Sequence, residues 1–474
     1  MDDRNARSRT IRWVICGMVL IGLNGLIAFL SFDFEYGSPL SSRPIIGFVV
    51  LEILAGIVYV GAVWGCWKRP TGPRLVVWIV AAGAIMRLAL LVSAPVQESD
   101  FYRYLWDGGV TAHGHNPYTL SPGEAAEPTE KTPASIRGLA KESERVVRRI
   151  SFPHLRTIYP PVAQAAFALG HWIGPWELGA WRLVLLLCEV LVLALLAALL
   201  GEVGLPPAAL ALYWWNPLVV KEVVNSAHMD VLILPFMLGA VLCIIKKRHL
   251  LAAVMLALAV GTKLWPVALL PVLFRSLTRR PKKLAAVLGI FGAPALTLLV
   301  PYALAASGED SGLMAYGGYW EMNDPLFMLV LWGVRPITGA LGGTAETAQL
   351  TTRVIMGLAI CGWIGWLARR PEDTPAGLCE KCLLAAAGLF LLSPAQFPWY
   401  ALWFIPLLAV RPRLSLVLLS VLLPLYYLRF YFLGIDSPEI FDYGIVFAEF
   451  VPVWLLLVRE AWTGRRWPGL EVPR

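Results

Sequence analysis

The stretch Trp181-Arg-Leu-Val-Leu-Leu-Leu-Cys-Glu-Val-Leu-Val-Leu-Ala-Leu-Leu-Ala-Ala-Leu-Leu200 indicates the fold class, because only Arg182 and Glu189 among its twenty residues are charged. An α-helix of this length rises about 30 Å, which matches the thickness of the hydrocarbon core of a bilayer. The segment is therefore predicted to cross a membrane as a single helix.

Similar apolar runs recur along the whole chain of 474 residues, which is 58% hydrophobic and only 15% charged. A soluble domain carries about 25% charged residues. The composition therefore predicts an all-α, polytopic integral membrane protein. The other single runs are Arg12–Phe32, Pro44–Trp67, Leu75–Pro95, Pro207–Val220, Val231–Ile245, Leu284–Tyr302, Thr351–Leu367, Leu414–Tyr431 and Ile445–Val458.

Two further segments, Leu250–Phe274 and Lys381–Arg411, have basic residues at both ends and must therefore cross the membrane an even number of times. Each is too short for two full spans. We predict compressed helical hairpins that turn at Gly261–Lys263 and at Ser393–Tyr400. With these hairpins the count is about 14 transmembrane helices.

The orientation follows from the basic residues, which gather at one set of helix ends, for example at Lys246–Arg248 and Arg411–Arg413. Such clusters mark cytoplasmic loops, so we expect a cell (inner or plasma) membrane protein with both termini cytoplasmic. Residues 96–177 then form a large first outer loop, in which Pro133–Ile150 is predicted as an amphipathic helix on the membrane surface. The net charge of +8 is explained by these loops, and a nucleic-acid partner is excluded.

A first polar cluster, Glu98-Ser-Asp-Phe-Tyr-Arg-Tyr-Leu-Trp-Asp107, directly follows the third predicted span. In a helix, Asp100, Tyr104 and Asp107 would share one face, with Arg103 near both acids. The aromatic residues beside these acids would suit stacking on a sugar ring. A purely structural alternative is an interfacial helix with one ion pair and a belt of aromatic side chains.

A second polar cluster, Lys221-Glu-Val-Val-Asn-Ser-Ala-His-Met-Asp230, joins two predicted spans at the outer surface. An ion pair between Lys221 and Glu222 would explain two of its polar residues but not the others. His228 and Asp230 could also bind zinc, although the sequence offers no third ligand nearby. The hairpin turns add Lys263 and Gln396, and the loop before Asp324 adds Glu321.

Together these motifs resemble bacterial GT-C-type glycosyltransferases, in the mannosyltransferase-like branch that uses polyprenyl-phosphate sugars. The similarity covers residues 75 to about 410. The matching pieces, in chain order, are Asp100–Gly108, His115–Tyr118, Tyr159–Pro161, Asn216–Glu222, Asn225–Asp230, Thr262–Lys263 and Ser393–Tyr400. The resemblance divides the chain into two extra N-terminal helices (1–74), a GT-C-like catalytic core (75–410), and C-terminal helices with a cytoplasmic tail (411–474).

The resemblance implies that the catalytic acid lies at the start of the outer loop, which makes Asp100 the expected general base. Relatives often carry two adjacent acids there, whereas this chain has Ser99 and Asp100 preceded by Glu98. A metal site formed by paired carboxylates is therefore in doubt, and a divalent metal remains open. No cofactor is firmly predicted.

The other candidate site residues fall into two groups. Those expected to bind the donor phosphate or sugar are Arg103, Lys221, His228, Lys263, Tyr102, Trp106 and Tyr400. Those expected to support them are Glu98, Asp107, Tyr159, Glu222, Asn225, Asp230, Glu321 and Gln396. Which basic residue binds the phosphate is left open.

The predicted function is glycosyl transfer with inversion at the anomeric carbon, carried out on the extracytoplasmic face of the membrane. The expected partners include membrane lipid. A sugar, expected to be mannose, would move from a polyprenyl-phosphate donor to a hydroxyl of a glycan or glycolipid acceptor. The alternatives are a secondary transporter or a lipid-linked sugar flippase. A transporter predicts internal repeats and polar residues near the bilayer midplane, whereas here the polar residues gather at one surface.

Overall fold

The computed structural model describes residues 2–64, 72–130, 132–305, 311–371, 374–465 and 467, and within these the regular elements are all helices. This confirms the predicted all-α class. Nine of the described helices are long and apolar enough to cross a membrane, or ten if the broken pair Pro217–Asn225 and Met229–Ile245 counts as one span. The expected count of 14 is not confirmed, because several predicted crossings are shorter or broken helices.

The segment Pro207–Val220 differs most from its prediction as a single span. It is divided into a 3-10 turn at Pro207–Leu210, α10 (Ala211–Trp214) and α11 (Pro217–Val220). Pro217 lacks a backbone N–H and so begins a new helix, which the side chain of Asn216 caps by accepting from the Val219 amide at 3.3 Å. Sequence hydropathy alone does not register these breaks.

The chain forms two compact units. Unit 1 comprises Met1–Gln97, Leu196–Asn225 and Glu321–Arg474, and unit 2 comprises Glu98–Leu195 and Ser226–Trp320. The division expected from the sequence (1–74, 75–410 and 411–474) stays a prediction. Beyond residue 465 only Trp467 is described, so most of the expected cytoplasmic tail lies outside the described residues.

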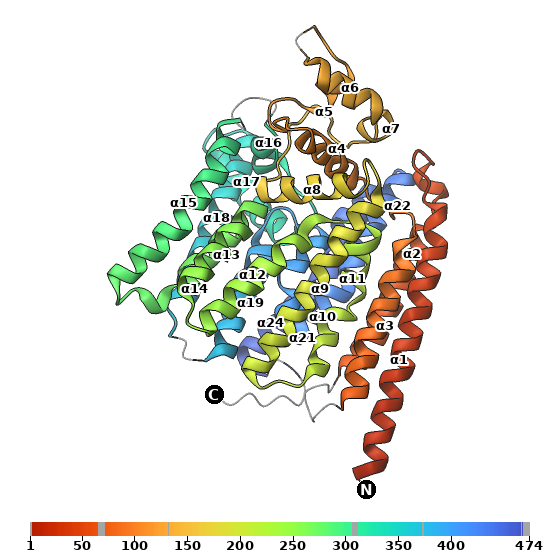
Figure 1. Ribbon diagram of the computed structural model, residues 1–474, viewed down its shortest axis with the longest axis vertical. Helices are drawn as coiled ribbons and strands as arrows, with labels where there is room; N and C mark the ends of the chain where they lie inside the picture. The colour runs from red at the N-terminus through yellow and green to blue at the C-terminus, as the bar shows by residue number, and fades with distance from the viewer. Residues whose placement is uncertain are drawn as a thin grey trace. The chain divides into compact units, whose positions relative to one another are not determined.

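In unit 1, helices α1 (Asp2–Leu30), α2 (Ile45–Val63) and α3 (Pro73–Leu91) run side by side (Figure 1). Gly83 of α3 lets the ring of Trp214 approach so closely that an added Cβ would lie 2.2 Å from it. The buried Arg87 guanidinium lies 3.5 Å from the centre of that ring and donates to the Trp214 carbonyl at 2.8 Å. A buried charge in an apolar helix is thereby satisfied by packing and hydrogen bonding.

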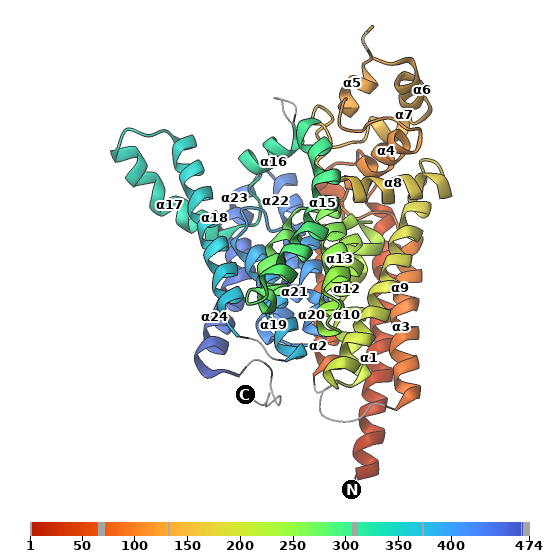
Figure 2. The ribbon, with the colours of Figure 1, turned by 60° about the vertical axis from the view of Figure 1, so that its left-hand side comes forward.

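The remaining helices of unit 1 come from the C-terminal part of the chain. Figure 2 shows α17 and α18 as an antiparallel pair. In the second predicted hairpin the first arm is a full-length helix, and only the returning arm after residue 397 is short. The bounds are α17 (Pro325–Ala340), α18 (Ala345–Arg369), α19 (Pro375–Leu392), α20 (Ile405–Leu408), α21 (Leu414–Leu422), α22 (Leu428–Gly434), α23 (Pro438–Ile440) and α24 (Val446–Thr463).

Unit 2 combines long helices with a group of short ones that lie at one end of them (Figure 1). Helices α12 and α13 pack as neighbours, and α13 ends at Thr262, where the first compressed hairpin was expected to turn. The bounds are α4 (Asp100–Ala112), α5 (Pro122–Ala126), α6 (Ala134–Glu142), α7 (Glu144–Val147), α8 (Pro161–Ile173), α9 (Leu178–Val203, which continues into unit 1), α12 (Ile233–Ile245), α13 (His249–Thr262), α14 (Leu270–Leu273), α15 (Pro281–Ala305) and α16 (Gly312–Tyr319).

The amphipathic segment of the first outer loop is present as α6 and α7, divided near Ser143. Its apolar side chains, including Ile136, Leu139 and Val147, are buried. They face other helices of unit 2, since α6 and α7 pack against α4 and α5. The expectation that this apolar face rests on the membrane surface is therefore wrong, because the protein itself covers it.

Candidate active site

Asp100 is the first residue of α4, the helix that the sequence predicted over this motif. Its side chain is half-buried. Within the described part of the chain, its carboxylate makes no hydrogen bond or ion pair with the protein. A partly exposed carboxylate without such a partner is available to a bound hydroxyl group.

Two charged residues near Asp100 come from the ends of neighbouring helices. Asp230 lies in the 3-10 turn that leads into α12, and Lys263 directly follows α13. Because α12 and α13 are consecutive antiparallel helices, the start of one meets the end of the other. The Lys263 ammonium lies 2.7 Å from Asp230 Oδ1, with the lysine side chain 22% exposed.

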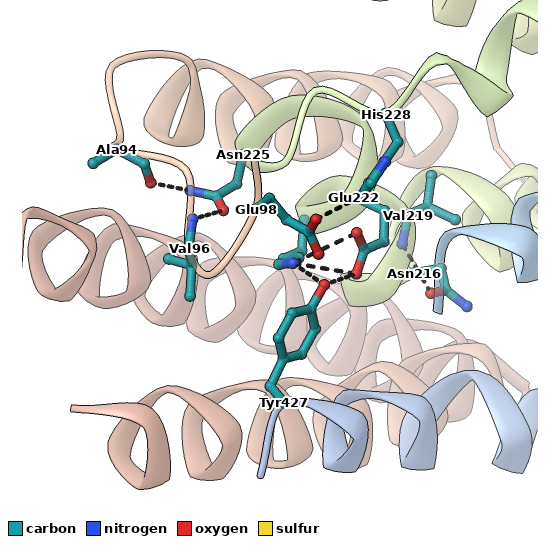
Figure 3. Close-up of polar contacts among 10 residues, drawn as sticks. Ala94, Val96, Glu98, Asn216, Val219, Glu222, Asn225, His228 and Tyr427 are labelled. Carbon is teal, nitrogen blue, oxygen red and sulfur yellow. Dashed lines mark hydrogen bonds and ion pairs between the residues drawn. The ribbon is translucent and has the colours of Figure 1, made fainter. Parts of the chain in front are cut away.

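A second charged pair joins the start of the outer loop to the same polar cluster. His228 Nε2 lies 3.4 Å from Glu98 Oε2, and both side chains are buried (Figure 3). The structure thus brings residues separated by more than a hundred positions into one polar contact. Glu98 and His228 were both expected at the site on sequence grounds.

These two pairs determine the electrostatic environment of Asp100. Burial raises the pKa of Asp100 to about 6, and the carboxylates of Glu98 and Asp230 act in the same direction. The positive charges of His228 and Lys263 oppose this shift. At neutral pH the carboxylate is therefore ionised, while its proton affinity is much higher than that of an ordinary aspartate.

Aromatic side chains form one wall beside Asp100. The rings of Tyr104 and Tyr159 meet edge to face at 5.2 Å, and Tyr104 stacks on Phe167 at 4.9 Å. Asp100 contributes to the raised pKa values of both tyrosines, so all three polar groups are close in space. Tyr159 is partly exposed, as the contact surface for a sugar would require.

Other candidates on α4 hold the surrounding structure. Arg103 donates to the Leu155 carbonyl at 2.6 Å, and Asp107 accepts from Gln164 at 3.2 Å. Tyr102 accepts a hydrogen bond from Arg149 at 3.0 Å. Trp106 is only 3% exposed and is stacked on Trp176, at 6.3 Å between ring centres, which leaves it little surface for a sugar.

Glu222 and Tyr427, both labelled in Figure 3, belong to unit 1 and form a buried polar cluster there with Lys221. The Lys221 ammonium lies 3.3 Å from Glu222 Oε1, and the Tyr427 hydroxyl donates to the same oxygen at 2.8 Å. Lys221 also donates to that hydroxyl and lies 3.7 Å from the centre of the tyrosine ring. The lysine charge is thus compensated by contacts within unit 1.

Asn225 holds the end of the third predicted span in place. Its Oδ1 accepts from the Val96 amide at 2.9 Å, and its Nδ2 donates to the Ala94 carbonyl at 2.7 Å (Figure 3). The same Nδ2 also donates to the Ser93 hydroxyl at 2.8 Å. Glu98 follows two residues after Val96, the last residue that Asn225 bonds in this way. Asn225 therefore has a positioning role, in keeping with its expected place among the supporting residues.

The remaining three candidates also lie in unit 1. Glu321 pairs with Arg353 at 2.9 Å, and the Gln396 side chain donates to the carbonyls of Leu391, at the end of α19, and of Ser393. Tyr400 is buried and stacks on Trp403 with 4.5 Å between ring centres. The contacts described for these three residues are all made within unit 1.

Comparison with known proteins agrees with the motifs. The family model for the N-terminal domain of alpha-(1->6)-mannopyranosyltransferases (MptA_B family) matches residues 155–279, which include Tyr159, His228 and Lys263. The alpha-(1->6)-mannopyranosyltransferase A of Mycobacterium tuberculosis is 24% identical over 396 residues, 77% of this chain and 72% of the relative. Both similarities are to mannosyltransferases and support a glycosyltransferase. No solved structure matches this chain.

Two tyrosines of this glycosyltransferase contribute contacts that the sequence did not assign to the site. Tyr104 was expected only to share a helix face with Asp100, and Tyr427 lies inside an apolar run with no polar motif around it. The partner of Tyr427 is 205 positions away. A signal existed for Tyr104 in its helical spacing from Asp100, but none existed for Tyr427.

Glu98 and His228 are also the residues of unit 2 that would suit a transition metal. A carboxylate oxygen and an imidazole nitrogen are ordinary zinc ligands, and here they lie 3.4 Å apart. They differ from the pair considered from sequence, His228 with Asp230, because Asp230 is paired with Lys263. A divalent metal stays a prediction.

Proposed function

We propose that the protein is an inverting mannosyltransferase with Asp100 as its general base. The Asp100 carboxylate removes the proton of an acceptor hydroxyl, whose oxygen forms a bond to the anomeric carbon of mannose. The bond from that carbon to the phosphate oxygen of the donor breaks, and polyprenyl phosphate leaves with the electron pair. The acceptor is a glycan or glycolipid, and transfer takes place on the extracytoplasmic face.

The proposal rests on the burial, the contacts and the pKa of Asp100. Its carboxylate is half-buried, makes no bond to the described protein, and has a pKa raised to about 6. A general base works best when its pKa is close to the working pH. The other acids around it are engaged, since Glu98 contacts His228 and Asp230 contacts Lys263.

Among the basic candidates, the contacts favour Lys263 as the group that stabilises the leaving phosphate. Its side chain is partly exposed and its charge acts on Asp100. Arg103 is committed to the Leu155 carbonyl, and Lys221 is buried against Glu222 and Tyr427. An ammonium group is a compact charge suited to a phosphate that gains charge during the reaction.

The stereochemistry supplies a further detail. The relative's name specifies an α-(1→6) linkage, and inversion to an α product requires a β-linked donor. We therefore propose a β-mannosyl polyprenyl phosphate as donor and a primary 6-hydroxyl of a mannose residue as acceptor. Transport or flipping is less well supported, since the relative and the matched family model are both named for mannosyl transfer.

The proposal is tested with purified protein, β-mannosyl polyprenyl phosphate and a panel of mannose-containing acceptors, with products analysed by mass spectrometry and NMR. Asp100→Asn is expected to lower kcat about 10²–10⁴-fold, the range for loss of a general base. Glu144→Gln is the matched control, because Glu144 is an exposed outer-loop acid whose ion pair within the described residues is with the exposed Arg148. A wild-type rate in Asp100→Asn, or a retained anomeric configuration, would contradict the proposal.

A further inference from the structure

Several buried side chains of unit 1 have oxygens that lack hydrogen-bond donors among the described residues, and four of them lie in the segments around residues 323, 396 and 449. These four oxygens are Asn323 Oδ1, Asp324 Oδ2, Gln396 Oε1 and Glu449 Oε2, and none has a partner among the described residues. The four side chains are at most 5% exposed. Buried polar atoms are nearly always satisfied, so four such oxygens in one region require an explanation.

The Asn323 and Glu449 side chains bond to each other, Gln396 joins them through its backbone, and Asp324 joins them through its place in the chain. Asn323 Nδ2 donates to Glu449 Oε1 at 2.9 Å and to the Gln396 carbonyl at 3.3 Å. The backbone N–H of Gln396 in turn donates to the Met322 carbonyl at 2.9 Å, and Asp324 directly follows Asn323 in the chain. Three segments of unit 1 thus meet here: residues 322–324, the loop around Gln396, and helix α24.

The orientation of the two amide groups follows from their surroundings. Gln396 Nε2 donates to the Leu391 and Ser393 carbonyls, and Asn323 Nδ2 donates to a carbonyl and a carboxylate. Turning either amide around would place its oxygen against these acceptors. The unsatisfied atoms are therefore oxygens and not misassigned nitrogens.

The backbone also contributes to this arrangement. Asn323 has φ +55°, in the left-handed region that non-glycine residues rarely occupy. Asparagine tolerates this conformation better than most residues, and here it aims the side chain at Glu449. In the next residue, Asp324 Oδ2 has no hydrogen-bond partner among the described residues.

The four unsatisfied side-chain oxygens can each accept from a ligand that supplies positive charge or hydrogen-bond donors. The four groups are two carboxylates and two amide carbonyls, and these are the oxygen ligands that calcium prefers. Of the neighbouring basic side chains, Arg353 pairs with Glu321 while its charge also acts on Asp324, and Arg429 contacts the Met322 sulfur. No lysine or arginine in the described residues bonds to the four oxygens.

We infer that Asn323, Asp324, Gln396 and Glu449 form a binding site for a hard divalent cation of the calcium type. The bound ion would join the loops at residues 322–324 and 396 to helix α24. This inference does not rest on the proposed transfer reaction, because all four residues belong to unit 1 and none contacts Asp100.

The test uses the full-length protein, stripped with a chelator and titrated with calcium. Thermal unfolding and terbium luminescence, sensitised by nearby aromatic residues such as Trp399, report binding without any turnover. We expect calcium to raise the unfolding midpoint and to displace terbium, with magnesium and sodium weaker. Glu449→Gln keeps the shape of the side chain and is expected to weaken calcium binding at least about tenfold, as loss of a ligand charge does.

Glu460→Gln is the matched control, since Glu460 is a buried glutamate of the same helix whose carboxylate is bonded by Arg413 and the Ser415 amide. Its calcium response should equal that of the wild type even if its stability falls. Asn323→Gly, which keeps the left-handed backbone, is the second site variant and should also lose the response. An absent calcium response in the wild type, or an unchanged one in Glu449→Gln and Asn323→Gly, would overturn the site.

Discussion

Among the acids around the outer-loop helix, Asp100 is distinguished by what it does not touch. Asp107 is bonded to Gln164, Asp230 to Lys263, and Glu98 lies against His228. Asp100 is influenced by neighbouring charges without contacting them in the described chain. The pKa of Asp100 is therefore determined by burial and by the electrostatic effect of neighbouring charges. A single substitution of one of these charged neighbours can change that pKa without breaking a bond to Asp100.

The first prediction at this scale concerns pH. A general base acts only when deprotonated, and burial raises the pKa of Asp100 to about 6. The value of kcat/KM should therefore fall about tenfold per pH unit below about pH 6 and level off above it. The measurement is a pH profile of mannosyl transfer at substrate concentrations well below KM. A profile that is flat down to pH 5, in protein shown to remain folded, would argue against Asp100 as the base.

The second prediction concerns Lys263. Lys263→Met should lower kcat/KM by about 10²-fold, the cost of losing one transition-state charge contact. It should also move the acid limb of the profile to higher pH, because Lys263 lowers the pKa of Asp100. Lys263→Arg keeps the charge and should leave the limb in place. If Lys263→Met loses activity but the acid limb of its pH profile stays where it is in the wild type, Lys263 has a structural role and does not act on the charge of Asp100.

At the scale of elements, the site depends on the close approach of α4 and α8. Tyr104 stacks on Phe167, and Gln164 bonds to Asp107 across the same interface. Gly108 makes this contact possible, since an added Cβ would lie 2.4 Å from the Phe167 carbonyl oxygen. The helix that carries Asp100 is thus positioned by a backbone contact that no side chain could replace.

The corresponding prediction is that Gly108→Ala destabilises the protein by about 1–3 kcal/mol, because the backbone of α8 must move. Gly138→Ala on α6 is the control, as no atom lies within 4 Å of its added Cβ and alanine favours helix by up to about 1 kcal/mol. Thermal unfolding in detergent measures both variants. Equal unfolding midpoints would show that the α4–α8 contact is looser than described here.

At the scale of the whole molecule, the sequence was most informative where a signal is local. Apolar runs such as 181–200 predicted membrane helices, because length and hydropathy alone determine whether a helix can span a bilayer. Helical spacing predicted α4 in the same way. Both inferences needed only neighbouring residues.

The sequence was uninformative where partners are distant. Trp106 was expected to contact sugar, yet Trp176 from a later segment covers it, and Tyr427 pairs with Glu222 across 205 positions. The breaks in the segment around Asn216 depend on proline and capping chemistry, which an average of hydropathy hides. Tertiary packing decides such cases, and a single sequence does not display it.

The prediction at this scale is the sidedness of unit 2. The positive charge at Lys246–Arg248 predicts that this turn is cytoplasmic and that the loop around Glu130 lies on the other side. In a cysteine-free background, Glu130→Cys should react with an impermeant maleimide on intact cells, whereas Lys247→Cys should react only after permeabilisation. Labelling of both positions from the same side would contradict the proposed topology.

The contact between Lys263 and Asp230 has a consequence for redesigning donor specificity. Each residue is the other's counterion, and Asp230 is almost completely enclosed. Replacing either one alone strands its partner's charge in a medium that solvates ions poorly. Variant libraries at this site should therefore change the two positions as a unit, so that neither charge is left buried without its counterion.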